Sequence, residues 1–166
     1  MKKDQLLSMF ESNLLNSAVD ATWLACAIDT DGFISIKRQS TKATGRTYVV
    51  YLPQVGFGNN SKEIVEHFGN LIKAKPHKTS LIKPYTDRYH WNVYTTNTEN
   101  ILTLLQNCLP YLIVKKAKAE FIIKYCKFRL SNPGDHSMKS SRTNEDHDWW
   151  EEFGKLFPTQ NRRTST

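Results

Sequence analysis

The spacing of apolar residues along the chain predicts helices separated by short strands. Leu6, Phe10 and Leu14 recur at the helical period, whereas the residues after Gly32 alternate between apolar and polar types with a period of two. From residue 20 to residue 109 the predicted elements follow the order αββαββα, with a further helix up to residue 130, which indicates an α+β fold. The predicted helices cover 3–17, 21–30, 61–72, 97–109, 115–130 and 146–156, and the strands cover 33–37, 47–57, 77–84 and 88–95.

Capping and turn residues set the expected ends of these elements. Asp20 and Ser61 are expected to be N-caps, because short polar side chains accept hydrogen bonds from the first turn of a helix. The polar residues 39–46 are expected to form a loop, as are residues 133–145 after an Asn-Pro-Gly sequence. Pro53 lacks an N–H donor, so it predicts a sheet edge or a bulge within its strand.

A length of 166 residues fits one domain with short extensions. We expect an N-terminal helical extension over 1–18, a central domain over 19–131, and a loop, short helix and tail over 132–166. No apolar run is long enough to span a bilayer, and polar residues interrupt the N-terminus where a secretory signal would be apolar. The three cysteines are far apart and odd in number, which is typical of reduced thiols. These features predict an intracellular protein that is not secreted and has no membrane partner.

Charge is unevenly distributed along the chain. The formal net charge is +7, and residues 33–60 contain Lys and Arg but no acidic residue. Residues 73–95 are also basic, whereas acidic residues cluster over 145–152. A basic zone separated from an acidic one indicates a surface for a polyanion such as nucleic acid. An ordinary basic protein with solvated lysines is the alternative.

The segment with the most chemical information runs from Trp23 to Ile36, where a helix with small residues ends in Asp29 and Asp31. Two carboxylates at one helix end suit a divalent cation, since hard cations prefer oxygen ligands. An EF-hand loop is excluded, because Gly32 as its sixth residue would place Ala27 and Arg38 at ligand positions. The plainer alternative is that the acids merely end the helix, although the helix dipole disfavours them there.

The nine residues from Leu24 to Gly32, LACAIDTDG, resemble the LAGLIDADG motif of homing endonucleases. The αββαββα order within residues 20–130 matches the core order of that family. The resemblance implies the LAGLIDADG fold with a saddle-shaped antiparallel sheet, here with N- and C-terminal helical extensions. The main departure is Cys26, where the family usually has a glycine at a close contact between helices.

The resemblance also implies an active site. It assigns Asp31 as the metal ligand, joined by the carbonyl of Thr30, and Mg²⁺ or Mn²⁺ as the cofactor. The segment Leu109-Pro110-Tyr111-Leu112-Ile113-Val114-Lys115 is similar to the family's Pro-aromatic-Leu-x-x-Lys segment and assigns Lys115 to the site. Asn59, with Asn60 as the next choice, corresponds to the polar residue that orients water. The plainer alternatives are a solvated helix start for Lys115 and a turn or cap for Asn59.

One motif per chain implies a homodimer whose motif helices pack beside a two-fold axis. Thr22, Cys26 and Asp29 are the residues expected at that interface. The implied partner is double-stranded DNA, with no small-molecule cofactor.

DNA recognition is expected from the two hairpins, because a β-ribbon fits the major groove. Side chains on one face of the strands are the candidates, and Tyr48 and Tyr51 are expected to join them. A shift of register by one residue would move any candidate to the other face. Lys42 and Arg46, in the first hairpin loop, are expected to contact backbone phosphates. The candidates on the strand face are Ser35, Lys37, Gln39, Gln54, Lys78, Ser80, Arg88, His90 and Asn92.

The function implied by the resemblance is a site-specific, intron-encoded homing endonuclease. It would hydrolyse phosphodiester bonds with a divalent metal at a long pseudo-palindromic target and leave 3′ overhangs. An RNA maturase or a non-catalytic DNA-binding regulator on the same fold is the alternative. A third hypothesis is an unrelated basic α+β RNA-binding domain, which would show no metal dependence.

Overall fold

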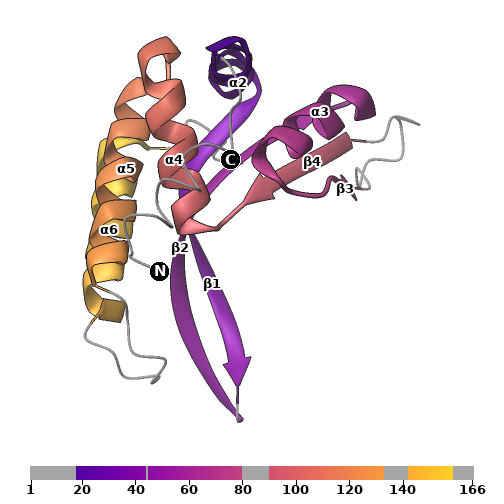
Figure 1. The fold of residues 1–166 in the computed structure, drawn as a ribbon. Helices are drawn as coiled ribbons and strands as arrows, with labels where there is room; N and C mark the ends of the chain where they lie inside the picture. The colour runs from indigo at the N-terminus through magenta and orange to yellow at the C-terminus, as the bar shows by residue number, and fades with distance from the viewer. Residues whose placement is uncertain (1–17, 44, 80–89, 133–141, 159–166) are drawn as a thin grey trace, which may run out of the picture.

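The computed structural model describes residues 18–43, 45–79, 90–132 and 142–158 (Figure 1). The strands are β1 (Gly32–Ala43), β2 (Arg46–Asn59), β3 (His77–Thr79) and β4 (His90–Thr95), in an antiparallel sheet with the order β1-β2-β4-β3. The helices are α2 (Ala18–Thr30), α3 (Lys62–Ile72), α4 (Thr98–Cys108), the 3-10 turn η1 (Leu109–Tyr111), α5 (Lys116–Ser131) and α6 (Arg142–Leu156). The predicted α+β class is confirmed, as is the order αββαββα, which runs from α2 to α4 and is followed by α5.

Polar caps begin the helices that follow the strands. Ser61 accepts a hydrogen bond from the backbone N–H of Ile64, and Asn97 accepts one from Asn100. Asp20, by contrast, lies inside the first turn of α2, because that helix begins at Ala18. Its predicted role as an N-cap is therefore wrong, although an acid in the first turn still suits the helix dipole.

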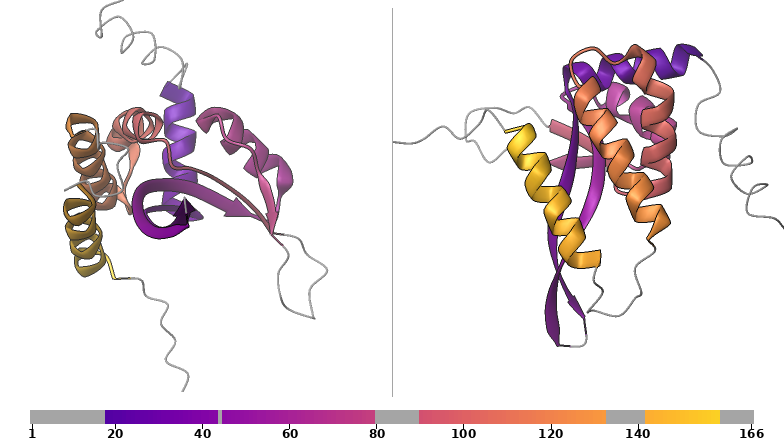
Figure 2. Two further views of the ribbon diagram at one scale, coloured as in Figure 1. Left: turned by 90° about the horizontal axis from the view of Figure 1, so that it is seen from below. Right: turned by 90° about the vertical axis from the view of Figure 1, so that its left-hand side faces the viewer.

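The β1–β2 hairpin is longer than its polarity predicted. Residues 39–43, expected to be a loop, continue β1 and pair with residues 46–50 of β2. Backbone pairing does not require apolar side chains. The residues of this outer part of β1 therefore show no alternation of apolar and polar types from which a strand could be predicted. The outer part of the hairpin extends beyond the helices (Figure 1; Figure 2), and Gly45 adopts a positive φ of 75° at its turn.

Pro53 lies in an uninterrupted stretch of the hairpin, opposite Ile36. The bulge alternative is therefore wrong. Pairing between β2 and β4 begins only at Val55, so Pro53 lies where β2 is locally an edge strand. The edge prediction is confirmed, since a missing N–H donor is tolerated there.

α6 begins at Arg142, so residues 142–145 are helical where a loop was predicted. The helix predicted over 3–17 lies outside the described residues, as do residues 80–84 and 88–89 of the last two predicted strands. In the described ranges, no helix combines the length and apolarity needed to cross a bilayer.

One face of the sheet forms the core with the helices. Ile34, Ile36, Val55, Phe57 and Val93 alternate along the strands and are buried in one cluster with side chains of α2, α3, α4 and α5. The intervening side chains of β1 and β2 are only partly buried. The second face of the sheet is therefore the polar face on which the predicted DNA contacts must lie.

α6 is joined to α5 and β2 by a buried polar cluster. Arg129 pairs with Asp146 at 3.0 Å, and their side chains are only 11% and 6% exposed. Tyr125 donates hydrogen bonds to the carbonyl of Tyr51 and to Asp146, and Arg129 donates to the same carbonyl. Burial raises the pKa of Tyr125, so its hydroxyl stays protonated as a donor. These bonds attach the C-terminal helix to the hairpin.

We predict that Asp146→Ala lowers the free energy of unfolding by about 3–5 kcal/mol, because it leaves Arg129 charged and buried without its partner. Equilibrium denaturation in urea measures the change. Asp148→Ala, which removes an exposed acid from the same helix, is the matched control and is expected to change stability by less than about 0.5 kcal/mol. Equal losses in the two variants would contradict the structural role of the pair.

Candidate active site

The candidate site lies where α2 ends and β1 begins. Thr30 ends the helix, and the backbone N–H of Asp31 still donates to Ala27 at 3.2 Å. At Gly32 a Cβ atom would lie 2.5 Å from the Cα of Ile28, so only glycine lets the chain turn so closely under the helix. This turn leaves the Asp31 side chain exposed at the helix end.

Asn59, the last residue of β2, connects that strand to Asp31. Its Nδ2 donates to Asp31 Oδ2 at 3.1 Å, and its Oδ1 accepts from the backbone N–H of Ser61 at 2.9 Å. The bond from Ser61 orients the amide so that its NH₂ group faces the carboxylate. Asn59 is therefore a turn residue that also contacts Asp31.

Asp29 and Lys115 bind each other's backbone. The Asp29 carboxylate accepts hydrogen bonds from the backbone N–H groups of Ile113, Val114 and Lys115 at 2.7–3.2 Å. The Lys115 ammonium donates to the carbonyls of Ile28 and Asp29 at 2.6 and 2.8 Å, with a longer contact of 3.4 Å to Thr30. We call this arrangement the reciprocal cap. The Asp29 side chain accepts hydrogen bonds from the backbone just before α5, where Lys115 lies, and the Lys115 side chain donates to backbone carbonyls at the end of α2, where Asp29 lies.

The reciprocal cap explains two charges that the sequence left unexplained. The helix dipole disfavours Asp29 at the end of α2 and Lys115 at the start of α5. Each side chain, however, extends to the neighbouring helix end, where its charge is favoured. α2 has no basic residue in its own last turn, so Lys115 supplies the cation there.

The two charged groups of the reciprocal cap have shifted pKa values. Desolvation alone would raise the pKa of Asp29, but the backbone hydrogen bonds from Ile113, Lys115 and Val114 together outweigh it and lower the pKa. Desolvation lowers the pKa of Lys115, opposed by the nearby negative charges of Asp29 and, more weakly, Asp31. Lys115 is therefore electrostatically coupled to the exposed carboxylate.

The donors at this helix end suit a hard divalent cation. Asp31 offers an exposed carboxylate and Thr30 a carbonyl at the same end of α2. Within the described ranges, no group of three or more His, Cys, Asp or Glu side chains is placed to enclose a metal. A single carboxylate with a carbonyl matches Mg²⁺, which is commonly held by one or two carboxylates and by substrate phosphates.

DNA-bound endonucleases share this architecture. The homing endonuclease I-CvuI, in complex with a DNA target, matches with a TM-score of 0.63 and 19% identity over 87% of this chain and 85% of its own. The group I intron-encoded homing endonuclease I-CeuI, complexed with DNA, matches with a TM-score of 0.60 and 11% identity over 96% and 82%. The LAGLIDADG homing endonuclease I-GzeII, in complex with a DNA target, matches with a TM-score of 0.54 and 14% identity over 83% of this chain and 48% of its own.

The chain has the LAGLIDADG homing endonuclease fold. The fold implied by residues 24–32 is therefore confirmed. No protein-family model and no curated protein sequence matches the chain. The agreement thus lies in the arrangement of helices and strands, and the remaining functional residues must be judged from their places in this fold.

In the LAGLIDADG fold of this chain, most of the described DNA-contact candidates share the polar face of the sheet. Ser35 pairs with Gln54, and Lys37 and Gln39 follow Ser35 at every second position of β1. Asn92 pairs with Gly58, which lies on the same face of β2 as Gln54, and His90 follows at the alternate position of β4. Lys42 is exposed, and Arg46 pairs with Ala43 beside the turn.

Two predicted strand contacts lie on the other face, which Lys42 near the turn also occupies. Lys78 pairs with Trp91, whereas its neighbour His77 pairs with Asn92, so His77 occupies the polar face in place of Lys78. Tyr51 is only 5% exposed, and its hydroxyl bonds His147 on α6. Both errors are shifts of one residue, which exchange the faces of a strand. Ser80 and Arg88 lie outside the described residues.

The predicted dimer residues differ in their surroundings. Thr22 and Cys26 are exposed on one side of α2, in line with Val19, whose side chain is 75% exposed. The Asp29 carboxylate instead binds its own chain through the reciprocal cap. The exposure of Ile113 and Val114, which are 85% and 75% exposed, could not be predicted from the sequence, because these residues belong to no periodic helix or strand.

We predict that Asp29→Asn lowers the free energy of unfolding by about 1.5–3 kcal/mol at neutral pH, since it weakens hydrogen bonds to a charged group. A lowered folded-state pKa contributes stability that is fully present above the unfolded value of 3.8 and is lost as pH falls through the folded value. Urea denaturation at a series of pH values should therefore show the two proteins converging in acid. Glu152→Gln, at an exposed position, is the charge-matched control, and a pH-independent deficit in Asp29→Asn would contradict this account.

Proposed function

We propose that the chain is a site-specific homing endonuclease that cleaves double-stranded DNA with Mg²⁺ or Mn²⁺. The observation that carries this proposal is Asp31. Asp29 and Lys115 have structural uses in the reciprocal cap, but Asp31 is exposed at a helix end that disfavours a carboxylate. Among the described residues its carboxylate accepts a hydrogen bond from Asn59, which orients it without covering it.

Each residue of the site has a separate proposed role. Asp31 and the carbonyl of Thr30 hold the divalent ion together with the scissile phosphate. When bound, the ion lowers the pKa of a coordinated water and neutralises charge on the phosphate. Asn59 is a positioning residue for Asp31 and orients the attacking water. Lys115 contributes a fixed positive charge beside the site, because its ammonium is held on the carbonyls of α2.

We further propose that two copies act together, each cutting one strand. Val19, Thr22 and Cys26 are exposed on one side of α2, and Ile113 and Val114 are exposed beside Asp29 at the end of that helix. The chain spans 85% of I-CvuI but 48% of I-GzeII, and we propose that a second copy of this chain takes the place of the rest of such a longer protein. A two-fold axis beside α2 would bring two Asp31 residues to the two strands of a pseudo-palindromic target and give 3′ overhangs.

We predict that Asp31→Asn lowers the rate of site-specific cleavage by at least ~100-fold, because even the supporting partners of metal ligands contribute 10–100-fold. The assay incubates DNA from the uninterrupted host locus of the proposed mobile intron with Mg²⁺ for cutting and Ca²⁺ for binding. Asp31→Asn should still bind in Ca²⁺, and Asp148→Asn should cut like the wild type.

The wild-type protein decides between the remaining functions. DNA binding without a cut in either ion would refute the nuclease and favour a DNA-binding regulator. Binding to intron RNA in place of duplex DNA would favour an RNA maturase.

The cysteines provide a test of the dimer. Cys26 is exposed on the proposed interface, whereas Cys108 and Cys126 are fully buried and burial raises their pKa values to about 12. We predict that a short bis-maleimide links two DNA-bound chains through Cys26, and that Cys26→Ser abolishes the product. A monomer by analytical ultracentrifugation on target DNA, with no linked species, would refute the homodimer.

A further inference from the structure

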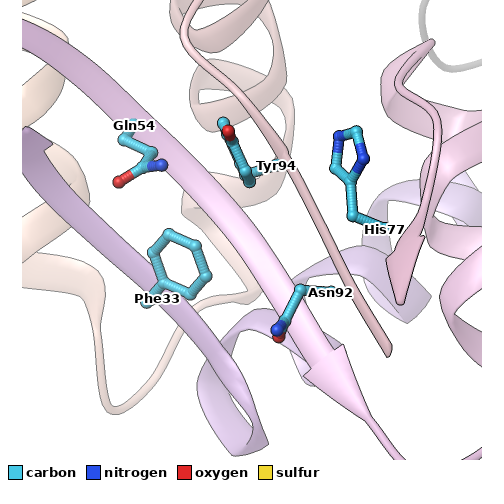
Figure 3. A pocket seen from close by; sticks show the side chains of 5 residues that line it. All are labelled: Phe33, Gln54, His77, Asn92 and Tyr94. Carbon is cyan, nitrogen blue, oxygen red and sulfur yellow. The ribbon is translucent and has the colours of Figure 1, made fainter. Parts of the chain in front are cut away.

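The polar face of the sheet contains a pocket of about 430 Å³ that the proposed mechanism does not use (Figure 3). Four strands contribute to it, and Figure 3 shows the side chains of Phe33, Gln54 and Tyr94 around a common space. The ring of His77 lies 5.9 Å from that of Tyr94 and extends the wall toward β3. The lining residues are Phe33, Gln54, His77, Asn92 and Tyr94.

Two glycines of β2 make room for these side chains. A Cβ atom at Gly56 would lie 2.4 Å from Cζ of Phe33, and one at Gly58 would lie 2.3 Å from Oδ1 of Asn92. Real Cβ atoms do not approach other atoms so closely, so any larger residue would displace the pocket wall. The missing side chains of β2 therefore allow its neighbours to lie across the strand and shape the pocket.

The chemistry of the pocket matches an A·T base pair seen from the major groove. Carboxamides of Asn and Gln pair with N6 and N7 of adenine, and apolar groups contact the methyl group of thymine. The pocket combines the carboxamides of Gln54 and Asn92 with the rings of Phe33 and Tyr94. Arg or Lys would suit guanine and Asp or Glu would suit cytosine, and neither kind is among the five lining residues.

A basic residue borders the pocket. The ammonium of Lys37 lies 5.4 Å from the centroid of the Tyr94 ring. Lysine supplies a compact charge that serves phosphate contacts, which position the protein without selecting bases. Lys37 is therefore assigned to the DNA backbone beside the pocket.

The position of the pocket relates it to the cleavage site. Phe33 follows Asp31 by two residues, which is at most ~7 Å along an extended strand. Gly45, at the hairpin turn, is a further ~40 Å along β1. The base pair at the pocket must therefore lie close to the scissile phosphate, at the inner end of each half-site.

We infer that this pocket recognises one A·T base pair next to the cut in each half-site, through Gln54 and Asn92 on adenine and Phe33 and Tyr94 on the thymine methyl group. The inference rests on the proposed function, since it assigns part of the target of the same protein. It adds a base identity and a position that the fold alone does not give.

The first test selects bound sequences from a randomised duplex DNA library in Ca²⁺, where cleavage is not needed. The wild type should enrich an inner A·T pair, and Gln54→Ala should lose roughly 5- to 150-fold of the discrimination between A·T and G·C there. Gln39→Ala is the matched control, because it removes the same side chain from the same face nearer the hairpin turn. It should leave the inner preference intact.

The second test removes the methyl group by replacing the inner thymine with uracil. The wild type should bind the uracil duplex about 4-fold more weakly, as expected for one buried methyl group. Phe33→Ala should bind both duplexes equally. Retained selection at outer base pairs shows that each variant is folded.

The outcomes separate this inference from the proposed function. If the wild type enriches no DNA sequence, both fail. If it enriches a sequence but selects G·C at the inner position, only the pocket assignment fails. Variants of Gln54 and Phe33 that keep the wild-type inner preference would also overturn it.

Discussion

The active-site end of α2 depends on an exchange of charges between two helix ends. Asp29 satisfies backbone N–H groups before α5, and Lys115 satisfies carbonyls at the end of α2, although the two residues are 86 positions apart. The exchange fixes the last turn of α2 against the segment that follows η1. It thereby holds the exposed Asp31 beside the end of β2 and presents Ile113 and Val114 next to the exposed side of α2. Loss of either partner would loosen the proposed metal site and the proposed dimer surface together.

The sequence predicted which residues meet at this end, but not how they meet. The motif and the Pro-aromatic-Leu-x-x-Lys segment assigned Asp31 and Lys115 to one site, and the structure brings both to the end of α2. The use of Lys115 as a cap was not predictable, because a bond across 86 positions leaves no local pattern. Lys78 and Tyr51 were placed on the wrong face because strand register is decided by pairing with neighbouring strands, which the residues of one strand do not encode.

The structure also explains part of the uneven distribution of charge along the chain. Part of the acidic cluster over 145–152 is used within the protein, since Asp146 is buried with Arg129 and Glu151 pairs with His147 and Lys155 on α6. The hairpin strands keep Lys37 and Lys42 without an acid on either strand. The hairpin therefore carries a net positive charge, which favours the approach of a polyanion.

The attachment of α6 to β2 has a consequence for synthesis of the protein. Domains form from the N-terminus as the chain leaves the ribosome, and the β1–β2 hairpin is made early. Its contacts with Asp146 and His147, however, come from the last helix of the described chain. A nascent chain can therefore pair its hairpin and bury much of its core before the hairpin gains its final support. On ribosome-bound chains of increasing length, the outer hairpin would therefore lack this support until α6 emerges.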